Sequence, residues 1–142
     1  MKLWGRRRLR AIALSILYQM DLLEEWNNRE KITQNTLKME KIDDPKKREF
    51  TENIVKTVCE NRESIDRIIS SYLKGWDIER LNVVERNILR IGVGELLFGM
   101  DIPYKVAINE AVELSKVFAA EGAASLINAV LDKVAREKGV KK

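Results

Sequence analysis

The sequence predicts an all-α protein, and three observations lead to that fold class. Apolar residues recur at helical spacing through most of the 142 residues. Two prolines and seven glycines are too few for the many turns of a β-sandwich or β-barrel. The composition, 45% hydrophobic and 34% charged, suits a helical chain that folds in water around one hydrophobic core. We therefore expect a single helical domain over residues 1–142.

The first predicted helix runs from about Gly5 to Glu25 and begins with a cluster of arginines. Its apolar residues form one stripe at 3.6-residue spacing: Leu9, Ile12, Ala13, Ile16, Leu17, Met20 and Leu23. Arg6, Arg7 and Arg10 fan out along one flank of that stripe. Cations at a helix N-terminus oppose the macrodipole and cost about 0.3–1 kcal/mol each. A nucleic-acid partner explains the cluster; the alternative is that the arginines lie over the edge of the bundle.

Two or three further helical segments are expected before the middle of the chain. A weakly amphipathic one covers residues 29–41, and the turn at 43–45 starts the next. From residue 46 to Tyr72 helical spacing continues with one polar interruption at 61–64, so one long helix or two helices are both possible. Gly75 fits a helix stop, and Trp76 is expected to pack the linker between the two halves of the chain.

Residues 82–118 predict a helical hairpin at the centre of the fold. Asn82 precedes an apolar run and Glu85 follows three residues later, which is the spacing of a capping box. Apolar positions cover most of the first helix, so other helices should surround it. Pro103 ends the connection, and an amphipathic helix continues to Phe118.

Several residues of the second half have expected structural roles. Three glycines of the first hairpin helix, Gly92, Gly94 and Gly99, are expected to allow close approach of a neighbouring backbone. Asn109 and Asn128 are expected to be buried hydrogen-bonding groups. The last helix should span about residues 123–138.

Positive charge is concentrated at the two ends of the chain. Residues 1–10 hold five basic side chains and no acid, and residues 133–142 hold five basic and one acidic. The 122 residues between them carry a net charge of −5. If the ends meet they form a basic patch suited to a polyanion; the alternative is that they are solubilising tails.

Composition also excludes several classes of function. With no histidine and only Cys59, the usual zinc sites and Cys–His or Ser–His catalysis are absent. No apolar run is long enough for a membrane span and no signal peptide is evident, so a cytoplasmic protein is expected. We expect no cofactor, no metal and no enzymatic activity; a remote alternative is a helical hydrolase using Glu110 and Glu113.

Three strings in the second half resemble the signature of the NusB family. They are VERNILRI with a following EL, then DIPYKVAINEAVELSKVF, then LINAVLDKV. The similarity extends over the whole chain, including the arginines at residues 6–10 and the segment Ala13–Tyr18. The resemblance implies an all-α, NusB-like fold of two packed sub-bundles, about 1–75 and 76–142.

The resemblance also implies a function and partners. NusB proteins bind boxA-type RNA as a heterodimer with NusE, a small-subunit ribosomal protein, and promote antitermination complexes on RNA polymerase at ribosomal RNA operons. Some family members form homodimers that cover the RNA surface, and NusB-like domains also precede RNA methyltransferase domains. We expect a stand-alone factor. The competing class is a protein-interaction bundle whose basic ends only keep it soluble.

By matched position, the resemblance assigns residues to two surfaces. The implied RNA-binding residues are Lys2, Arg6, Arg7, Arg10, Tyr72, Arg90 and Leu126. The implied residues for the ribosomal-protein partner are Tyr18, Leu22 and Glu85. Two departures affect the RNA surface: Gly122 stands where relatives can carry an acidic residue, and Leu126 where they can carry an aromatic. Leucine cannot stack on a base as an aromatic ring does.

Overall fold

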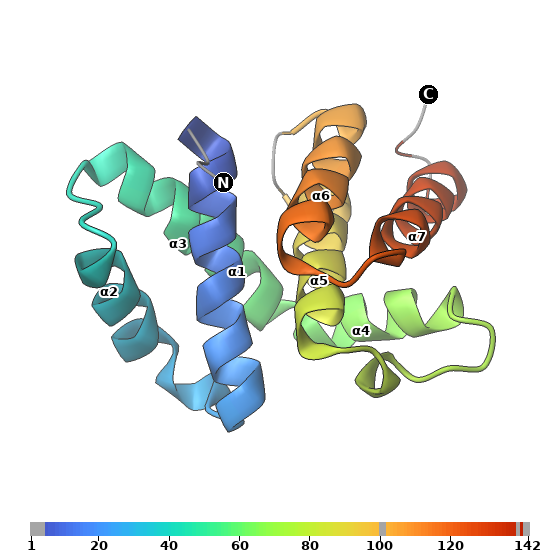
Figure 1. The fold of residues 1–142 in the computed structure, drawn as a ribbon, viewed down its shortest axis with the longest axis horizontal. Coiled ribbons are helices and arrows are strands. Elements are labelled where there is room, and N and C mark those ends of the chain that lie inside the picture. The colour runs from blue at the N-terminus through green and yellow to red at the C-terminus, as the bar shows by residue number, and fades with distance from the viewer. Residues whose placement is uncertain (1–4, 100–101, 139, 141–142) are drawn as a thin grey trace.

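The computed structural model describes residues 5–99, 102–138 and 140, and these residues form helices and no strands (Figure 1). The prediction of an all-α fold is confirmed. The α-helices are α1 (Gly5–Leu23), α2 (Arg29–Met39), α3 (Pro45–Glu60), α4 (Arg62–Ser71), α5 (Val83–Leu97), α6 (Tyr104–Phe118) and α7 (Ala123–Glu137). Two short 3-10 helices, Trp26–Asn28 and Ile78–Arg80, precede α2 and α5.

Helix α5 is the centre of the molecule. It packs against α1 and α3 on one side and against α4, α6 and α7 on the other, and Figure 1 shows α1–α3 and α4–α7 as two groups. The expected division near residue 75 separates α4 from α5, whereas the structure packs these two helices together. The largest fully buried side chains come from both groups: Ile16, Leu17, Met20, Leu37, Ile65, Ile69, Ile88, Leu89, Ile91, Leu114, Ile127 and Leu131.

Local sequence signals explain where the helices begin and end. The Asn82 side-chain oxygen accepts hydrogen bonds from the backbone N–H groups of Val84 and Glu85, at 2.8 and 3.1 Å, and so caps α5 as predicted. Asp44 caps α3 in the same way, with Pro45 in the first turn. The long segment after residue 45 divides at Asn61 into two helices.

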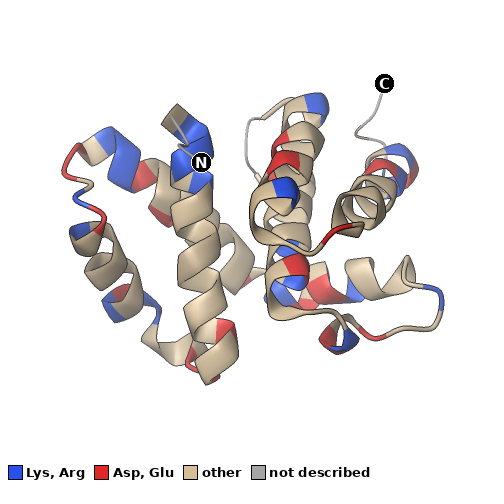
Figure 2. Ribbon diagram, in the orientation of Figure 1, with Lys and Arg blue, Asp and Glu red and all other residues tan. Residues whose placement is uncertain are grey.

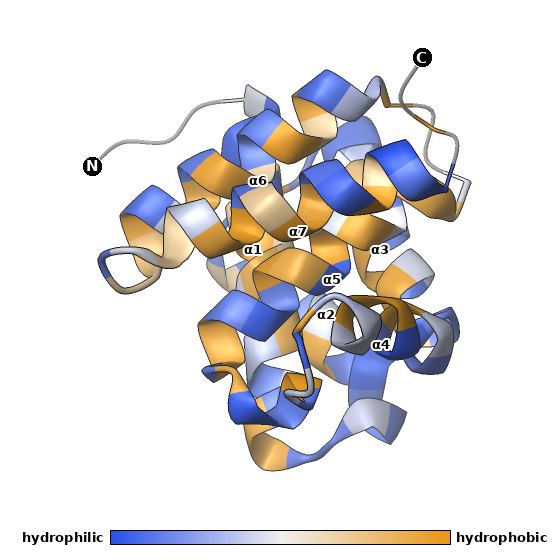
Figure 3. Ribbon diagram, turned by 90° about the vertical axis from the view of Figure 1, so that its right-hand side faces the viewer, coloured by the Kyte–Doolittle hydropathy of each residue, from blue (hydrophilic) through white to orange (hydrophobic). Residues whose placement is uncertain are grey.

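The amphipathic pattern accounts for the packing of the remaining helices. Figure 3 shows hydrophobic and hydrophilic residues alternating along the helix ribbons, as expected for helices that each bury one face. In the part of the chain that the structure describes, no helix combines the length and the hydropathy that crossing a bilayer requires.

The glycines and asparagines of the second half differ from expectation. A Cβ atom on Gly92 would lie 2.7 Å from Cδ1 of Leu131, so this glycine makes room for a side chain of α7 rather than for a backbone. Gly99 lies beyond the end of α5 with a φ of +84°, a turn conformation that favours glycine. Asn109 and Asn128 are exposed, so the prediction that they are buried is wrong. Both lie on the outer faces of amphipathic helices.

Candidate nucleic-acid interface

The arginines at the start of α1 have different environments. Arg6 is exposed, and its guanidinium carbon lies 5.1 Å from the centre of the Phe50 ring. Arg8 is also exposed and donates a hydrogen bond to the carbonyl oxygen of Glu40 at 2.9 Å. Lys2 lies outside the described residues. The start of α1 is therefore a basic edge beside α2 and α3, as Figure 2 shows.

Arg7 binds a carboxylate of α6 but stays at the surface. Its Nε and Nη2 atoms donate to Glu110 at 3.1 and 2.7 Å, and 37% of the Arg7 side chain is exposed. These hydrogen bonds and the charge of Arg7 lower the pKa of Glu110 despite its partial burial, and Glu110 in turn raises the pKa of Arg7. The guanidinium thus retains its positive charge and a solvent-facing edge.

Arg10 lies inside the protein. Its Nε atom donates to Glu95 of α5 at 2.8 Å, with 3% and 2% of the two side chains exposed. Its Nη1 atom is 3.7 Å from Glu110. Burial raises the pKa of Glu95, although the charge and hydrogen bond of Arg10 oppose that rise. Arg10 therefore joins α1 to α5 and α6, and a direct contact with RNA would require it to leave these partners.

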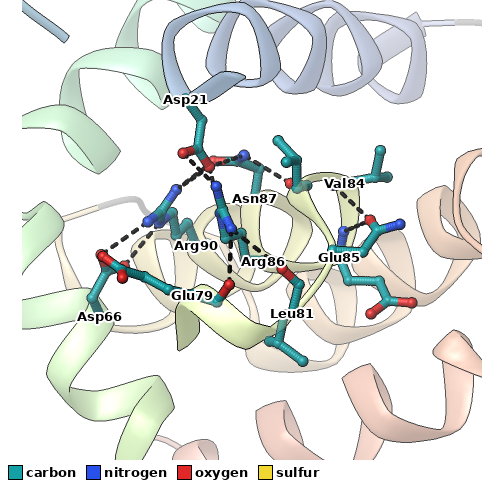
Figure 4. Close-up of polar contacts among 11 residues, drawn as sticks. Asp21, Asp66, Glu79, Leu81, Val84, Glu85, Arg86, Asn87 and Arg90 are labelled. Carbon is teal, nitrogen blue, oxygen red and sulfur yellow. Dashed lines mark hydrogen bonds and ion pairs between the residues drawn. The ribbon is translucent and has the colours of Figure 1, made fainter. Parts of the chain in front are cut away.

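Arg90 is equally enclosed, between α1, α4 and α5 (Figure 4). Its guanidinium donates to Asp66 at 2.8 and 2.9 Å and to Asp21 at 2.8 Å. Arg86 donates to the same Asp21 at 2.6 and 2.7 Å, and Asn87 does so at 2.9 Å. Burial alone would raise the pKa of Asp21, but these partners outweigh burial, and the pKa lies below its usual value.

Tyr72 and Leu126 line one groove between the end of α4 and α7. The groove has a volume of about 450 Å³ and is also lined by Leu73, Leu81, Ala129, Val130, Trp76, Lys74 and Lys133. Trp76 is 55% exposed, so it forms a wall of this groove and does not pack the linker as predicted. The Tyr72 hydroxyl donates to Glu137 at 3.3 Å. Trp76, Lys74 and Lys133 are candidate contacts that sequence reasoning missed; an aromatic residue in a polar linker was the available signal.

One of the residues predicted to bind a protein partner, Tyr18, lies at a hollow on another face. Tyr18 and Val84 line this hollow of about 270 Å³ together with Ala11, Leu14, Ser15 and Phe118. Glu85 follows Val84 on α5, and Leu22 lies one turn beyond Tyr18 on α1 and is exposed. Phe118 of α6 is also exposed here. The walls of the hollow are therefore mainly apolar.

The described parts of the two basic regions, residues 5–10 and 133–138, do not merge. Helix α6 packs against both α1 and α7 and lies between them (Figure 1). The described basic residues of the last helix therefore lie across α6 from the arginines of α1.

The carboxylates considered for catalysis have other partners. Glu110 is bound by Arg7, and Glu113 is 3.0 Å from the ammonium group of Lys116. Within the described ranges, no group of three cysteine, aspartate or glutamate side chains is placed to hold a metal ion. Cys59 is half-buried against the core, and burial raises the pKa of its thiol.

Comparison with known proteins agrees with this arrangement. A family profile described as the NusB family matches residues 7–136. The transcription antitermination protein NusB of Acetivibrio thermocellus is 40% identical over 134 residues, covering 94% of this chain and 90% of the relative. The protein of the same name from Bacillus cereus strain B4264 is 39% identical over 129 residues, covering 91% and 95%. These names describe a transcription factor, in agreement with the prediction that the protein is not an enzyme.

Solved structures have the same fold. T. maritima NusB superposes with a TM-score of 0.85 at 36% identity, covering 96% of this chain and 94% of that one. A crystal structure of the antitermination factors NusB and NusE in complex with dsRNA matches with a TM-score of 0.85 at 32% identity, covering 93% and 96%. Sequence and fold agree, and the chain belongs to the NusB family of transcription antitermination proteins.

Proposed function

We propose that this protein is an antitermination factor that binds boxA-type RNA together with the ribosomal protein NusE. The complex would assemble on RNA polymerase and act at ribosomal RNA operons. The observation that carries the proposal is a surface-accessible basic edge on α1 in a chain of the NusB family. A solved relative in complex with NusE and dsRNA supports both partners.

The described side chains on the proposed RNA surface fall into two kinds, those that can contact RNA directly and those that hold the contacting residues in place. Arg6 and Arg7 are accessible to phosphates and bases, while the groove of Tyr72, Trp76 and Leu126 offers aromatic and apolar walls. Arg10 and Arg90 are buried and support this surface indirectly, by holding α1 against α5. Tyr18, Leu22 and Glu85 form the surface proposed for NusE.

RNA binding can be measured by fluorescence anisotropy with a labelled boxA-like single strand and a scrambled strand, at several salt concentrations. We expect preferential binding to the boxA-like strand that tightens when NusE is added. Replacing Arg6 and Arg7 by alanine should weaken binding and reduce the slope of log affinity against log salt by about 0.7 for each lost phosphate contact.

Arg67→Ala removes an exposed arginine from α4 and is the matched control, which should bind as the parent does. An unchanged salt slope in the Arg6→Ala/Arg7→Ala variant would show that these two arginines do not contact RNA phosphates. Normal NusE binding without RNA binding at any salt would favour the protein-interaction bundle instead. Light scattering at the same concentrations would detect a homodimer that competes for either surface.

A further inference from the structure

The arginines of α1 are one part of the RNA surface proposed above, and beside them unpaired positive charge continues onto α3. Arg6 of α1 lies over the ring of Phe50, and the Thr51 hydroxyl donates to the carbonyl oxygen of Leu9 at 3.5 Å. These contacts bring the N-terminal halves of the two helices together. In Figure 2 the basic residues at the start of α3 lie next to those at the start of α1.

Lys46 and Lys47 extend this edge. They precede Phe50 by four and three residues, so they lie on the same side of α3 as the ring that Arg6 covers. Both side chains are exposed. Among the residues that the structure describes, neither ammonium group forms an ion pair with a carboxylate.

The acidic groups nearest in sequence are not paired with Lys46 or Lys47. Asp44 accepts the backbone N–H of Lys47 at 3.0 Å as the cap of α3, and Glu40 lies 3.7 Å from Arg8. Asp43 and Glu49 are exposed, and neither is paired with Lys46 or Lys47. Arg48 donates to the carbonyl oxygen of Ile42 and to Gln34, which are neutral partners. Residues 43–49 hold three basic and three acidic side chains and are formally neutral, so the feature that distinguishes this edge is the two exposed, unpaired ammonium groups of Lys46 and Lys47.

Helix stability does not explain this arrangement. Neither α1 nor α3 has an acidic residue in its first turn, and both start with consecutive basic residues that oppose the helix dipole. Two such helix starts lie side by side. Lysine is a strongly hydrated point charge that suits phosphate and is depleted in the core of protein interfaces. An RNA backbone therefore fits this edge better than a protein does.

We propose that Lys46 and Lys47 form an accessory site for the phosphodiester backbone of single-stranded RNA. The site would bind nucleotides that flank the element held at Arg6 and Arg7, without reading their sequence. This inference rests on the proposed function. It predicts that an RNA longer than the recognised element binds more tightly, with a steeper dependence on salt.

The test compares a boxA-like strand of about a dozen nucleotides with the same strand carrying ten uridines at its 5′ or its 3′ end. We expect one of the two extensions to increase the affinity of the parent protein and the salt slope. Lys46→Gln combined with Lys47→Gln should abolish that increase, reducing the slope by about 0.7 per contact, and should leave binding of the short strand unchanged. Lys31→Gln with Lys56→Gln removes the same charge from other exposed positions and should keep the gain.

The outcomes are distinguishable. If neither extension adds affinity, or if the Lys46→Gln/Lys47→Gln variant keeps the gain, the accessory site is overturned while the proposed function stands. A third outcome is that the parent binds a uridine-extended scrambled strand as tightly as the extended boxA-like strand, and that the variant loses the gain in affinity from either extension. The accessory site then stands, and the proposed recognition of boxA fails. Binding of a ten-residue polyglutamate peptide that depends on the two lysines, with no gain from RNA extension, would assign the edge to an acidic protein and overturn the proposal. Thermal unfolding checks the fold, because removing these cations should not lower the melting temperature.

Discussion

The guanidinium of Arg10 and the carboxylate of Glu95 form an ion pair in the interior, 2.8 Å apart. Taking both charges out of water is costly, and the pair offsets that cost only while both partners are present. Burial raises the pKa of Glu95 even with Arg10 beside it. The residue that sequence similarity implies as an RNA contact thus has a clear role in holding α1 against α5.

Removing one partner of this ion pair should therefore lower the free energy of unfolding more than removing both. We expect Arg10→Met to lower the free energy of unfolding by about 3–5 kcal/mol, since it leaves the Glu95 carboxylate buried and unpaired. Without Arg10 the pKa of Glu95 rises further. An acid with a raised pKa destabilises the folded state as pH increases above the unfolded value of about 4.3, so the loss should be larger at pH 7 than at pH 5.

Urea unfolding of three variants measures this effect. Arg10→Met with Glu95→Leu should recover much of the stability, and Arg8→Met, an exposed position, should change it by about 0.5 kcal/mol or less. If the double variant is as unstable as Arg10→Met alone, the unpaired carboxylate is not the cause.

The sequence could predict which arginines begin α1 but not which of them face inward. A helical wheel places Arg6, Arg7 and Arg10 on one flank, yet Arg6 is exposed and Arg10 is buried. The difference comes from Glu95 and Glu110, which are 85 and 100 residues away along the chain. Partners at such separations are set by tertiary packing, which spacing along one helix cannot reveal.

At the scale of the elements, local sequence signals predicted helix boundaries better than they predicted which side chains are buried. The Asn82 cap and the turn before α6 each depend on a few neighbouring residues, and the structure has helix boundaries at both. The polar interruption at 61–64 left one helix or two open, and the structure has two. The role of the α5 glycines depends instead on which helix crosses them. Gly92 faces the fully buried Leu131 of α7, whereas Gly94 faces Thr57 and Val58 of α3 at ordinary contact distances of 3.5 and 3.6 Å.

Alanine substitutions at these two glycines should have opposite effects. Alanine favours a helix over glycine by about 1 kcal/mol at either position. At Gly92 the new methyl group would lie 2.7 and 2.9 Å from the two Cδ atoms of Leu131, and overpacking of this kind costs about 1–3 kcal/mol. We expect Gly92→Ala to be destabilising and Gly94→Ala to be neutral or stabilising.

Thermal unfolding of the two variants provides the comparison, each serving as the other's control on the same helix. A stabilised Gly92→Ala protein would show that α7 can shift away from α5 without cost. A Gly94→Ala protein that loses stability as much as Gly92→Ala would show that contact distance does not govern either site.

At the scale of the whole molecule, the relative placement of the two helix groups decides what the proposed RNA surface can do. The α1 arginines belong to one group, and the groove of Tyr72 and Leu126 to the other. Asp21 of α1 accepts hydrogen bonds from Arg86, Asn87 and Arg90 of α5, and Arg90 also binds Asp66 of α4. This network joins the groups at a point where both contribute charged side chains (Figure 4).

Stability should therefore depend on the charge of Asp21. The pKa of Asp21 in the folded protein is lower than its unfolded value of about 3.9, so its stabilising contribution is present above about pH 4 and is lost as pH falls through the folded pKa. We expect Asp21→Asn to lower the free energy of unfolding by about 1–3 kcal/mol at pH 7. On acidification, the Asp21→Asn variant should lose less stability than the parent protein.

Urea unfolding between pH 7 and pH 3 tests this, with Asp43→Asn at an exposed turn as the control. A parent–variant difference that is the same at every pH would show that the ion pairs of Asp21 do not hold the two groups together, and that shape alone sets their placement.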